Sequence, residues 1–198
     1  EDLSAAVVDE LLARTGVGSD AVEDLLWGCA QQTGEQGNNL ARLVALCSEL
    51  GESVPAATIN RWCASSAEAI TRAADAVAAG HRECVVAGGV ENMSRVGNLR
   101  GLSSVHPEIR SRYGIDALRM GTTAETVAEE HAVTRKSQDE YALRSHRRAA
   151  DAADAGRFED ELVSVETADG VVTEDEGIRR DTSLDALAAL PPAFDDHG

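Results

Sequence analysis

Aromatic residues and membrane-length apolar runs are scarce in this 198-residue chain. Aromatic residues make up only 3% of it, so alanine, valine and leucine must fill the interior. No stretch approaches the roughly 20 apolar residues of a membrane span, so no such span is predicted. Hydrophobic residues are nevertheless 43% of the chain and charged residues 27%, a balance typical of a globular protein with one domain or slightly more.

Positive charge is also scarce. The net charge is -17, from 35 acidic and 18 basic residues, and Lys136 is the only lysine. Such a chain has no bulk attraction for phosphate backbones or anionic lipid, so neither nucleic acid nor a membrane surface is predicted as a partner. Acid-rich, lysine-poor surfaces stay hydrated in concentrated salt, which favours a halophilic host. A GC-rich genome that favours arginine and alanine codons is the alternative, and the two are compatible.

The cysteines are few and widely spaced, at Cys29, Cys47, Cys63 and Cys84. No C-x-x-C pair exists, which excludes a zinc ribbon or a thioredoxin-type motif. The histidines have no metal-ligand spacing, so no metal site is predicted. Scattered thiols in an acidic chain indicate an intracellular, cytoplasmic protein. Cys29, Cys47 and Cys84 fall on predicted strand or helix core positions and are expected to be packing residues.

Residues 1–92 alternate between helix and strand patterns. Apolar residues at helical spacing, each run followed by a glycine, predict helices over 3–15, 38–50 and 63–79. Short apolar runs predict buried strands over 22–29, 55–60 and 83–89. No phosphate-binding glycine pattern follows Gly88 and Gly89. We therefore interpret them as a turn at which the chain and a ligand pass close to each other. The alternation predicts an α/β fold with parallel strands.

The pattern changes after Met93. Residues 94–121 contain glycines, serines and five arginines with little periodicity, and are expected to be a long irregular excursion. Helices are then predicted over 123–131, 136–155 and 183–190, an edge strand over 161–167, and a hairpin turn at Asp169-Gly170. We therefore expect an α/β domain over residues 1–92 and a subdomain over residues 93–198, inserted into or attached to the first sheet.

The segment from Asn60 to Ser66, N-R-W-C-A-S-S, joins a predicted strand to a long helix. Unpaired N–H groups and the positive end of the helix dipole would stabilise a thiolate at Cys63. The same N–H groups can hold the oxyanion of an acyl intermediate. The residues alone leave two interpretations open, a nucleophile or a cysteine packed at the strand–helix junction.

Several segments in order resemble signatures of the thiolase family. Val54 to Ala69 resembles the nucleophile segment of that family, and Ala87 to Ser94 (A-G-G-V-E-N-M-S) resembles its next signature. Further matches in order are M-G-T-T-A-E at 120–125, S-Q-D at 137–139, S-H-R-R-A at 145–149, G-R-F at 156–158, and the stretch 178–194. The resemblance spans essentially the whole chain. It implies the thiolase-like layered αβαβα architecture, here as an incomplete N-terminal domain that lacks its first strand and carries a CoA-binding loop subdomain.

The resemblance also implies a reaction. In thiolases, the cysteine at the position of Cys63 takes the acyl group from a 3-ketoacyl-CoA, acetyl-CoA departs, and a second CoA collects the shortened chain. In the condensing direction, the cysteine is acetylated and a carbanion from another acetyl-CoA attacks it. Cys63 is therefore the expected catalytic nucleophile of an acyltransferase, with its N–H in an oxyanion hole. Its Cys-Ala-Ser-Ser form is closer to degradative members, which favours fatty acid β-oxidation.

Coenzyme A is the implied co-substrate, and no covalently bound cofactor is expected. By resemblance, Arg179 matches a CoA-contacting arginine, Phe194 an aromatic near the adenine or pantetheine, and Met120 a residue near the thioester. Arg119 stands beside Met120, where some members have histidine, and is a further candidate. Between Arg95 and Arg119, five arginines and two acids give a local charge of +3, which suits an anion site. Solvated arginines paired with acids elsewhere are the alternative.

Thiolases are about twice this length by resemblance. Their second half supplies a Gly-His-Pro histidine that activates the nucleophile and a second cysteine that moves the α-proton, and neither motif occurs here. The chain is expected to be part of a longer thiolase, or a subunit whose partner brings the C-terminal domain, and to have no turnover alone. The family resemblance implies a homodimer or homotetramer.

Two other functions stay open. A ketoacyl-synthase-type condensing enzyme shares the architecture, but the CoA signatures around Met120 and Arg179 argue against it. A catalytically silent thiolase-like protein that binds acyl-CoA or acts as a scaffold is the other, and the intact Cys63 argues against it.

Overall fold

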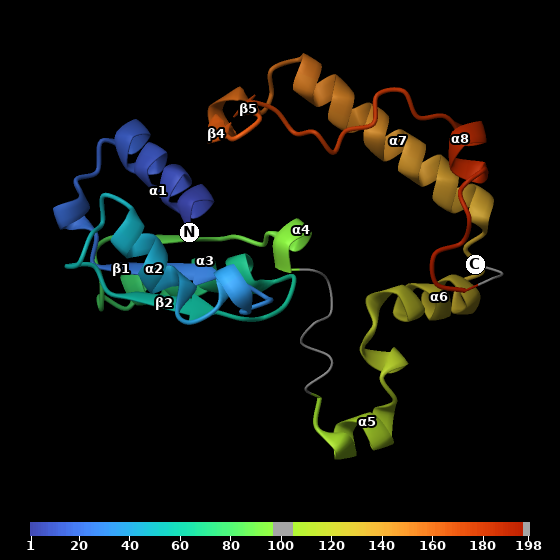
Figure 1. Cartoon of the computed structure of the whole chain (residues 1–198), viewed down its shortest axis with the longest axis horizontal. Coiled ribbons are helices and arrows are strands. Elements are labelled where there is room, and N and C mark those ends of the chain that lie inside the picture. Colours follow the sequence, from blue (N-terminus) through green and yellow to red (C-terminus); the bar gives the residue numbers. More distant parts are fainter. Residues whose placement is uncertain (97–104, 196–198) are drawn as a thin grey trace. The chain divides into compact units, whose positions relative to one another are not determined.

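The computed structural model describes residues 1–96 and 105–195. The chain divides into two compact parts, unit 1 (residues 1–101) and unit 2 (residues 102–198) (Figure 1). The short helix α4 (Met93–Val96), which we assigned to the second region from the sequence, contacts the 3-10 turn Gly34–Gln36 of unit 1.

Unit 1 is built on a three-stranded parallel sheet in the order β2-β1-β3. Its strands are β1 (Asp24–Gly28), β2 (Ala56–Ile59) and β3 (Val85–Gly89). Gly28, the last residue of β1, pairs with Ile59 on one side and Gly89 on the other, so the three strands end in register. The carboxyl ends of all three strands therefore form one edge of the sheet, where α/β proteins commonly bind their ligands.

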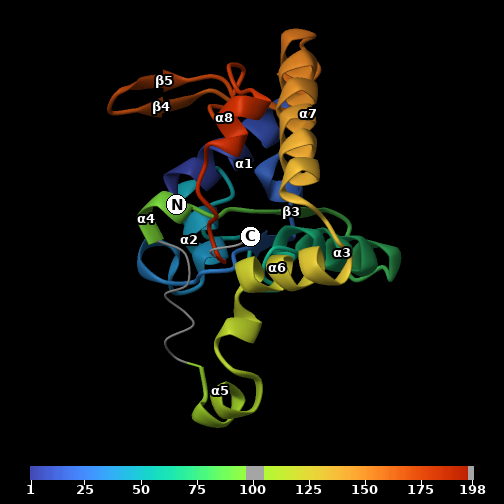
Figure 2. The same ribbon diagram turned by 90° about the vertical axis from the view of Figure 1, so that its right-hand side faces the viewer.

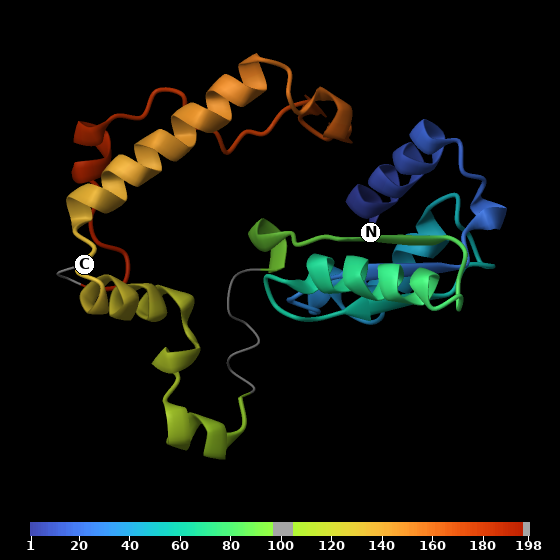
Figure 3. The same ribbon diagram turned by 180° about the vertical axis from the view of Figure 1, so that it is seen from behind.

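Helices cover both faces of this sheet. They are α1 (Asp2–Thr15), α2 (Leu40–Cys47) and α3 (Ser65–Ala78). Figures 1 and 3 show α2 on one face and α3 on the other, and α1 packs against α2. The predicted α/β fold with parallel strands is confirmed, and it agrees with the thiolase-like architecture. Each predicted helix begins or ends within a few residues of its observed bounds.

The core lies between the sheet and the α1–α2 layer. Leu25 of β1 is completely buried, and Leu40 and Val44 of α2 pack in the same cluster. Trp27 is buried beside them, and its indole Nε1 donates to Ser4 Oγ of α1 at 3.2 Å. On the other face, α3 buries the small side chains Ala69 and Ala73, which lets the helix approach the sheet closely.

Unit 2 is mostly helical. Its elements are α5 (Pro107–Tyr113), a 3-10 turn (Asp116–Leu118), α6 (Met120–Glu130), α7 (Arg135–Asp154), a 3-10 turn (Glu159–Glu161), β4 (Val165–Thr167), β5 (Gly170–Val172) and α8 (Leu184–Ala188). α8 packs against α7 (Figure 2), and β4 and β5 form an antiparallel hairpin. The expected hairpin is present, but its turn is Ala168-Asp169, one residue earlier than predicted.

The expectation of an irregular excursion over 94–121 is wrong for its described part. That stretch contains α4, α5, a 3-10 turn and the start of α6. Helices of four to seven residues present too few apolar positions to show a period. α5 is instead specified by its ends, because His106 Nδ1 accepts the N–H of Glu108, Pro107 follows the cap, and Gly114 ends the helix. Residues 97–104 lie outside the described residues.

The described residues lack two further features. No helix there combines the length and the apolarity needed to cross a bilayer. Residues 1–96 and 105–195 also contain no group of three or more histidine, cysteine or acidic side chains placed to hold a metal ion.

Candidate functional site

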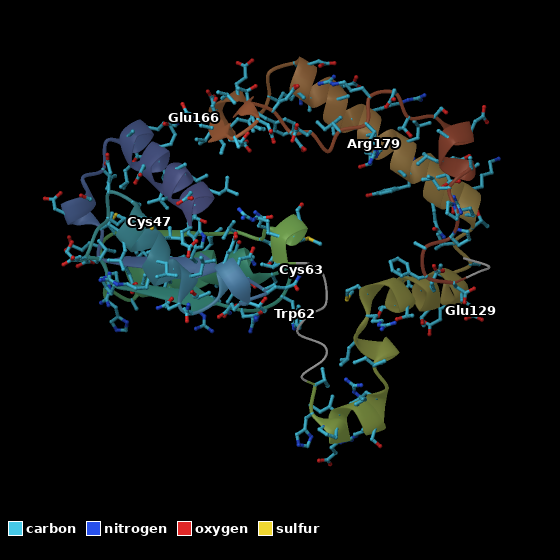
Figure 4. All side chains as sticks on the ribbon, viewed as in Figure 1. Cys47, Trp62, Cys63, Glu129, Glu166 and Arg179 are labelled. Atoms are coloured by element: carbon cyan, nitrogen blue, oxygen red, sulfur yellow. The ribbon has the colours of Figure 1, made fainter. Side chains whose placement is uncertain are left out.

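The turn that carries Cys63 follows β2 at the carboxyl edge of the sheet. Helix α3 begins at Ser65 with Ala64 as its N-cap, so Cys63 precedes the helix by two residues and the predicted start at residue 63 is slightly early. The Cys63 side chain is exposed, as Figure 4 shows, so Cys63 is not a buried packing residue. The preceding residue, Trp62, has a left-handed backbone with φ of 50° and is 57% exposed.

Side chains within the turn fix its shape. The Asn60 Oδ1 accepts the N–H of Trp62 at 3.0 Å. The hydroxyl of Ser65 accepts the N–H of Arg61 at 2.9 Å and donates to the carbonyl of Trp62 at 2.6 Å. The buried Ser65 therefore holds both Arg61 and Trp62 of the turn at the start of α3.

An ion-pair network joins the turn to α3. Glu68 accepts from Arg61 Nη1 at 2.5 Å and from Arg72 Nε at 2.9 Å. The hydrogen bond from Arg72 is the main cause that lowers the pKa of the Glu68 carboxyl, and the positive charges of Arg61 and Arg72 act in the same direction against the effect of burial. Glu68 therefore stays ionised at neutral pH and holds Arg61 beside the helix.

Glycines let α3 approach the ends of the strands. A Cβ on Gly28 would lie 2.5 Å from the backbone nitrogen of Ser66, and one on Gly89 would clash with the Ser66 hydroxyl and the Gly28 carbonyl. A Cβ on Gly88 would lie 2.6 Å from the Trp27 ring. The prediction of a turn at Gly88-Gly89 is therefore wrong. Both glycines belong to β3, and the close neighbours are a tryptophan ring and helix α3.

The loops after β1 and β3 meet at the same edge. The Glu91 Oε2 accepts the N–H groups of Ala30 and Gln31, at 2.8 and 3.3 Å. Its Oε1 accepts from Gln36 Nε2 at 2.5 Å, and Gln36 is 4% exposed. Asn60 Nδ2 donates to the Ala30 carbonyl at 2.8 Å. The three loops thus form one hydrogen-bonded network.

The other cysteines differ from one another. Cys29 is buried, as predicted, and burial raises the pKa of its thiol to about 11, with the Glu91 carboxylate adding to the increase. Cys84 is half-buried beside the core. The prediction for Cys47 is wrong, because its side chain is exposed at the end of α2. Cys29 is therefore inert at neutral pH, whereas Cys47 and Cys63 are both accessible thiols.

In unit 2, the predicted CoA-binding residues Phe194 and Met120 lie near each other, because Phe194 packs on Gly121, the neighbour of Met120. The Phe194 ring lies against Gly121, where a Cβ would clash with it. Gly121 follows Met120 in α6, and Arg119 is the N-cap of that helix. Met120 is 72% exposed and Phe194 66% exposed. These two apolar side chains are accessible to a ligand beside the N-terminus of α6.

Arg179 lies elsewhere in unit 2, beside helix α7 (Figure 4). Its N–H donates to His146 Nδ1 at 3.2 Å, so His146 has a structural contact. The side chain of Arg179 is exposed and has no acidic partner among the described residues, whereas Arg180 pairs with Asp154 at 2.6 Å.

At least one arginine of the arginine-rich stretch is paired with an acidic side chain. Arg95 belongs to unit 1 and pairs with Glu35 at 2.8 Å, which is the alternative considered from the sequence. Arg112 stacks on Tyr113, with 5.2 Å from its guanidinium carbon to the ring centroid. Arg100 lies outside the described residues. The local charge of +3 is therefore reduced by at least one ion pair.

Asn60, Ser65 and Glu91 were not predicted as site residues. All three do lie within segments that resemble family signatures, and Asn60 and Ser65 also belong to the predicted strand–helix junction around Cys63. The partners of Asn60 and Glu91 are 30 and 61 residues away in sequence, so no local pattern reveals the contacts.

Comparisons with known proteins show the family of the chain. The sequence matches the family described as thiolase, N-terminal domain, over residues 1–198. It is 46% identical over 200 residues to a 3-ketoacyl-CoA thiolase of Marinomonas sp. (strain MWYL1), covering 98% of this chain and 51% of that protein. Proteins with the same name from Erwinia tasmaniensis and Escherichia coli O139:H28 are 45% and 43% identical, each with 98% of this chain and 52% of the relative covered. The chain spans about half the length of the curated relatives it matches. The chain belongs to the thiolase family.

Proposed function

We propose that this chain provides the acyl-accepting half of a 3-ketoacyl-CoA thiolase, with Cys63 as the nucleophile. The observation that carries the proposal is the exposed thiol of Cys63 in a hydrogen-bonded turn at the carboxyl edge of the parallel sheet. The 3-ketoacyl-CoA thiolases that share up to 46% identity with it support this assignment. We place the reaction in the degradative direction, fatty acid β-oxidation, in the cytoplasm.

In the proposed first step, one bond forms and another breaks at C3 of the 3-ketoacyl chain. The Cys63 thiolate attacks the 3-keto carbonyl carbon, the C2–C3 bond breaks, and the electron pair leaves with acetyl-CoA, which takes up a proton at C2. A second CoA thiolate then attacks the acyl-cysteine carbonyl, which returns the Cys63 thiolate and releases the shortened acyl-CoA. The Cys63 N–H donates to the oxyanion in both halves of the reaction.

Coenzyme A is proposed to bind through unit 2. Met120 and Phe194 offer apolar surface to the pantetheine and the adenine, and both are more than half exposed. The Arg179 guanidinium can pair with a phosphate, and Arg119 is at the N-cap of α6 next to Met120. Specific cationic groups are needed because the chain as a whole carries a net charge of -17 and repels CoA.

The proton-transfer groups are proposed to come from the half of the relatives' length that this chain does not span. That half is either a continuation of this chain or a partner chain, and the assembly is proposed to be a homodimer or homotetramer. Because no base reaches Cys63 from the described residues, we expect the purified 198-residue chain to have no turnover. Full thiolase activity of that chain alone would contradict this expectation.

Acetyl transfer to Cys63 tests the nucleophile directly, because it needs no proton removal from carbon and because an alkaline buffer ionises thiols in place of the missing base. We expect incubation with acetyl-CoA to place an acetyl thioester on the peptide that contains Cys63, found by mass spectrometry, and excess free CoA to remove it. The Cys63→Ser variant is the control for the site of labelling. The absence of an acetyl thioester on Cys63 would contradict the proposed function.

A thioester without the nucleotide tests the role of unit 2. We expect acetyl N-acetylcysteamine to label Cys63 equally in the wild-type chain and in Arg179→Ala, whereas acetyl-CoA labels the variant several-fold more slowly. Arg148→Ala, on the exposed surface of α7, is the matched control. Equal acetyl-CoA rates in all three proteins would remove Arg179 from the proposed CoA site.

A further inference from the structure

The backbone of Trp62 demands an explanation, because it immediately precedes Cys63. Its φ of 50° is in the left-handed region, which large side chains seldom adopt. The indole is 57% exposed, so burial of the ring does not hold this conformation in place. Such conformations persist where surrounding contacts over-determine them, and they are common at functional sites.

Ser65 binds the carbonyl of Trp62, and Asn60 adds contacts with both ends of its amide. The Oδ1 accepts the N–H of Trp62 at 3.0 Å, and the Nδ2 donates to the Ala30 carbonyl at 2.8 Å. One side chain therefore sets the Trp62 peptide relative to the loop that follows β1. A turn held only by its own residues could shift as a whole, and the bond to Ala30 prevents that.

Glu91 in turn fixes the Ala30 peptide. Its Oε2 accepts the N–H of Ala30 at 2.8 Å, and its Oε1 accepts from the buried Gln36. The Oε1 of Gln36 accepts the N–H of Asn92 at 2.5 Å, which closes the network on the loop after β3. A continuous series of contacts therefore runs from β3 through Glu91, Ala30 and Asn60 to the residue before Cys63.

We propose that Asn60 and Glu91 are positioning residues for Cys63. Asn60 holds the Trp62 peptide in its left-handed conformation, and Glu91 holds the Ala30 peptide against which Asn60 is fixed. Together they set the direction of the Cys63 thiol and of its N–H toward the carbonyl of an acyl group. This inference rests on the proposed function of Cys63 as the acyl acceptor. Neither residue touches the reacting atoms, so their effect is on geometry.

The test compares a reaction that depends on geometry with one that does not. Acetyl transfer from acetyl-CoA requires an aligned thiol and an oxyanion donor, whereas iodoacetamide requires only an accessible thiolate. We expect Asn60→Ala to slow acetylation of Cys63 by about tenfold or more, as small misplacements of reacting groups do. Alkylation of Cys63 and of Cys47 should change less than about twofold, because both thiols stay exposed.

Two further variants separate positioning from simple loss of stability. Asn39→Ala removes an amide that also bridges two segments, since Asn39 contacts Ala56 and Thr58 without contacting the Cys63 turn. It should leave the ratio of acetylation to alkylation at Cys63 unchanged. Glu91→Gln keeps the shape of the side chain but weakens its acceptors, and should lower the ratio by a smaller factor than Asn60→Ala. A ratio unchanged by Asn60→Ala would overturn the proposal.

A second measurement keeps the inference testable if Cys63 is not acetylated at all. In the wild-type chain, the Trp62 amide should be protected from hydrogen exchange by Asn60, and Asn60→Ala should remove that protection while the amide of Ala41 stays protected. Asn60→Asp retains an accepting oxygen and should therefore restore part of the protection of the Trp62 amide. Unchanged exchange at Trp62 in Asn60→Ala would overturn the proposal. Failure of acetylation in the wild-type chain would instead count against the proposed function.

Discussion

Unit 1 and unit 2 differ in where they keep their apolar side chains. All but one of the buried apolar residues in the described chain belong to unit 1, and the exception is Leu143 of α7. Unit 2 instead exposes Met120, Tyr141 and Phe194 by more than half of their surface. The cysteine that we propose as the nucleophile is in the packed unit, and the residues that we propose for CoA binding are in the other.

This difference separates two requirements of a group-transfer site. A nucleophile must be aligned closely with the carbon that it attacks, and unit 1 supplies the buried core and the hydrogen-bonded network that can do this. A long, flexible co-substrate tolerates a less rigid surface. We therefore expect unit 2 to open locally at a lower free energy than unit 1, because fewer of its side chains are buried.

The largest contrast is expected from matched core and surface truncations. Leu25→Ala removes a completely buried side chain of β1 and should lower the free energy of unfolding of unit 1 by about 2–5 kcal/mol. Leu184→Ala in α8, where the leucine is 42% exposed, should change stability by no more than about 0.5 kcal/mol. Both tryptophans of the chain belong to unit 1, so in urea unfolding tryptophan fluorescence reports on that unit, and the circular dichroism of the helices is needed to report on unit 2. Equal losses of unfolding free energy in Leu25→Ala and Leu184→Ala would contradict the difference between the two units.

Glycine replacements give a second, smaller contrast. Gly28→Ala places a Cβ against the backbone of α3, which cannot rotate away, and should cost about 1–3 kcal/mol by the same measurement. Gly121→Ala meets only the Phe194 ring, which can turn aside, and alanine favours helix α6. Its effect on helix stability, measured by circular dichroism, should be neutral or favourable. A destabilisation as large as that of Gly28→Ala would mean that unit 2 is packed as tightly as unit 1.

A third effect, spread over two pH units, concerns the pH dependence of unit 1. The pKa of Cys29 is about 11 in the folded chain against an ordinary value of 9.0. Below pH 9 both states hold the proton, and between pH 9 and 11 only the unfolded state loses it. The free energy of unfolding should therefore fall over that interval, by about 1–3 kcal/mol, and level off above it. Cys29→Ser should reduce this slope, and an identical slope in the variant would show that Cys29 is not shielded from water.

The sequence predicted the elements of unit 1 well because their signals are local. Gly16 caps α1 and Gly80 follows the C-cap of α3, and short apolar runs form the strands of the parallel sheet. The exposure of Cys47 could not be predicted in the same way, because α2 (L-A-R-L-V-A-L-C) is apolar on nearly every side and its period does not tell which face is buried. In unit 2, the short helix α5 depends on its caps and shows no usable period.

The candidate site was predictable only at its centre. A cysteine between a strand and a helix, within a family signature, indicated Cys63. The contacts of Asn60 with Ala30 and of Glu91 with Ala30 join residues 30 and 61 positions apart, and such contacts appear only when the strands are placed side by side. The same holds for the contact of Phe194 with Gly121.

The relative reactivity of the two exposed thiols in one molecule tests the central claim most directly. Figure 4 shows Cys63 at the carboxyl edge of the sheet and Cys47 toward the other end of unit 1. The rates at which acetyl-CoA and iodoacetamide modify each cysteine can be followed by mass spectrometry of the two peptides. If Cys63 is the acyl acceptor, acetyl-CoA should favour Cys63 over Cys47 by at least about tenfold more than iodoacetamide does. Equal preferences for the two reagents would contradict the assignment of Cys63 as the nucleophile.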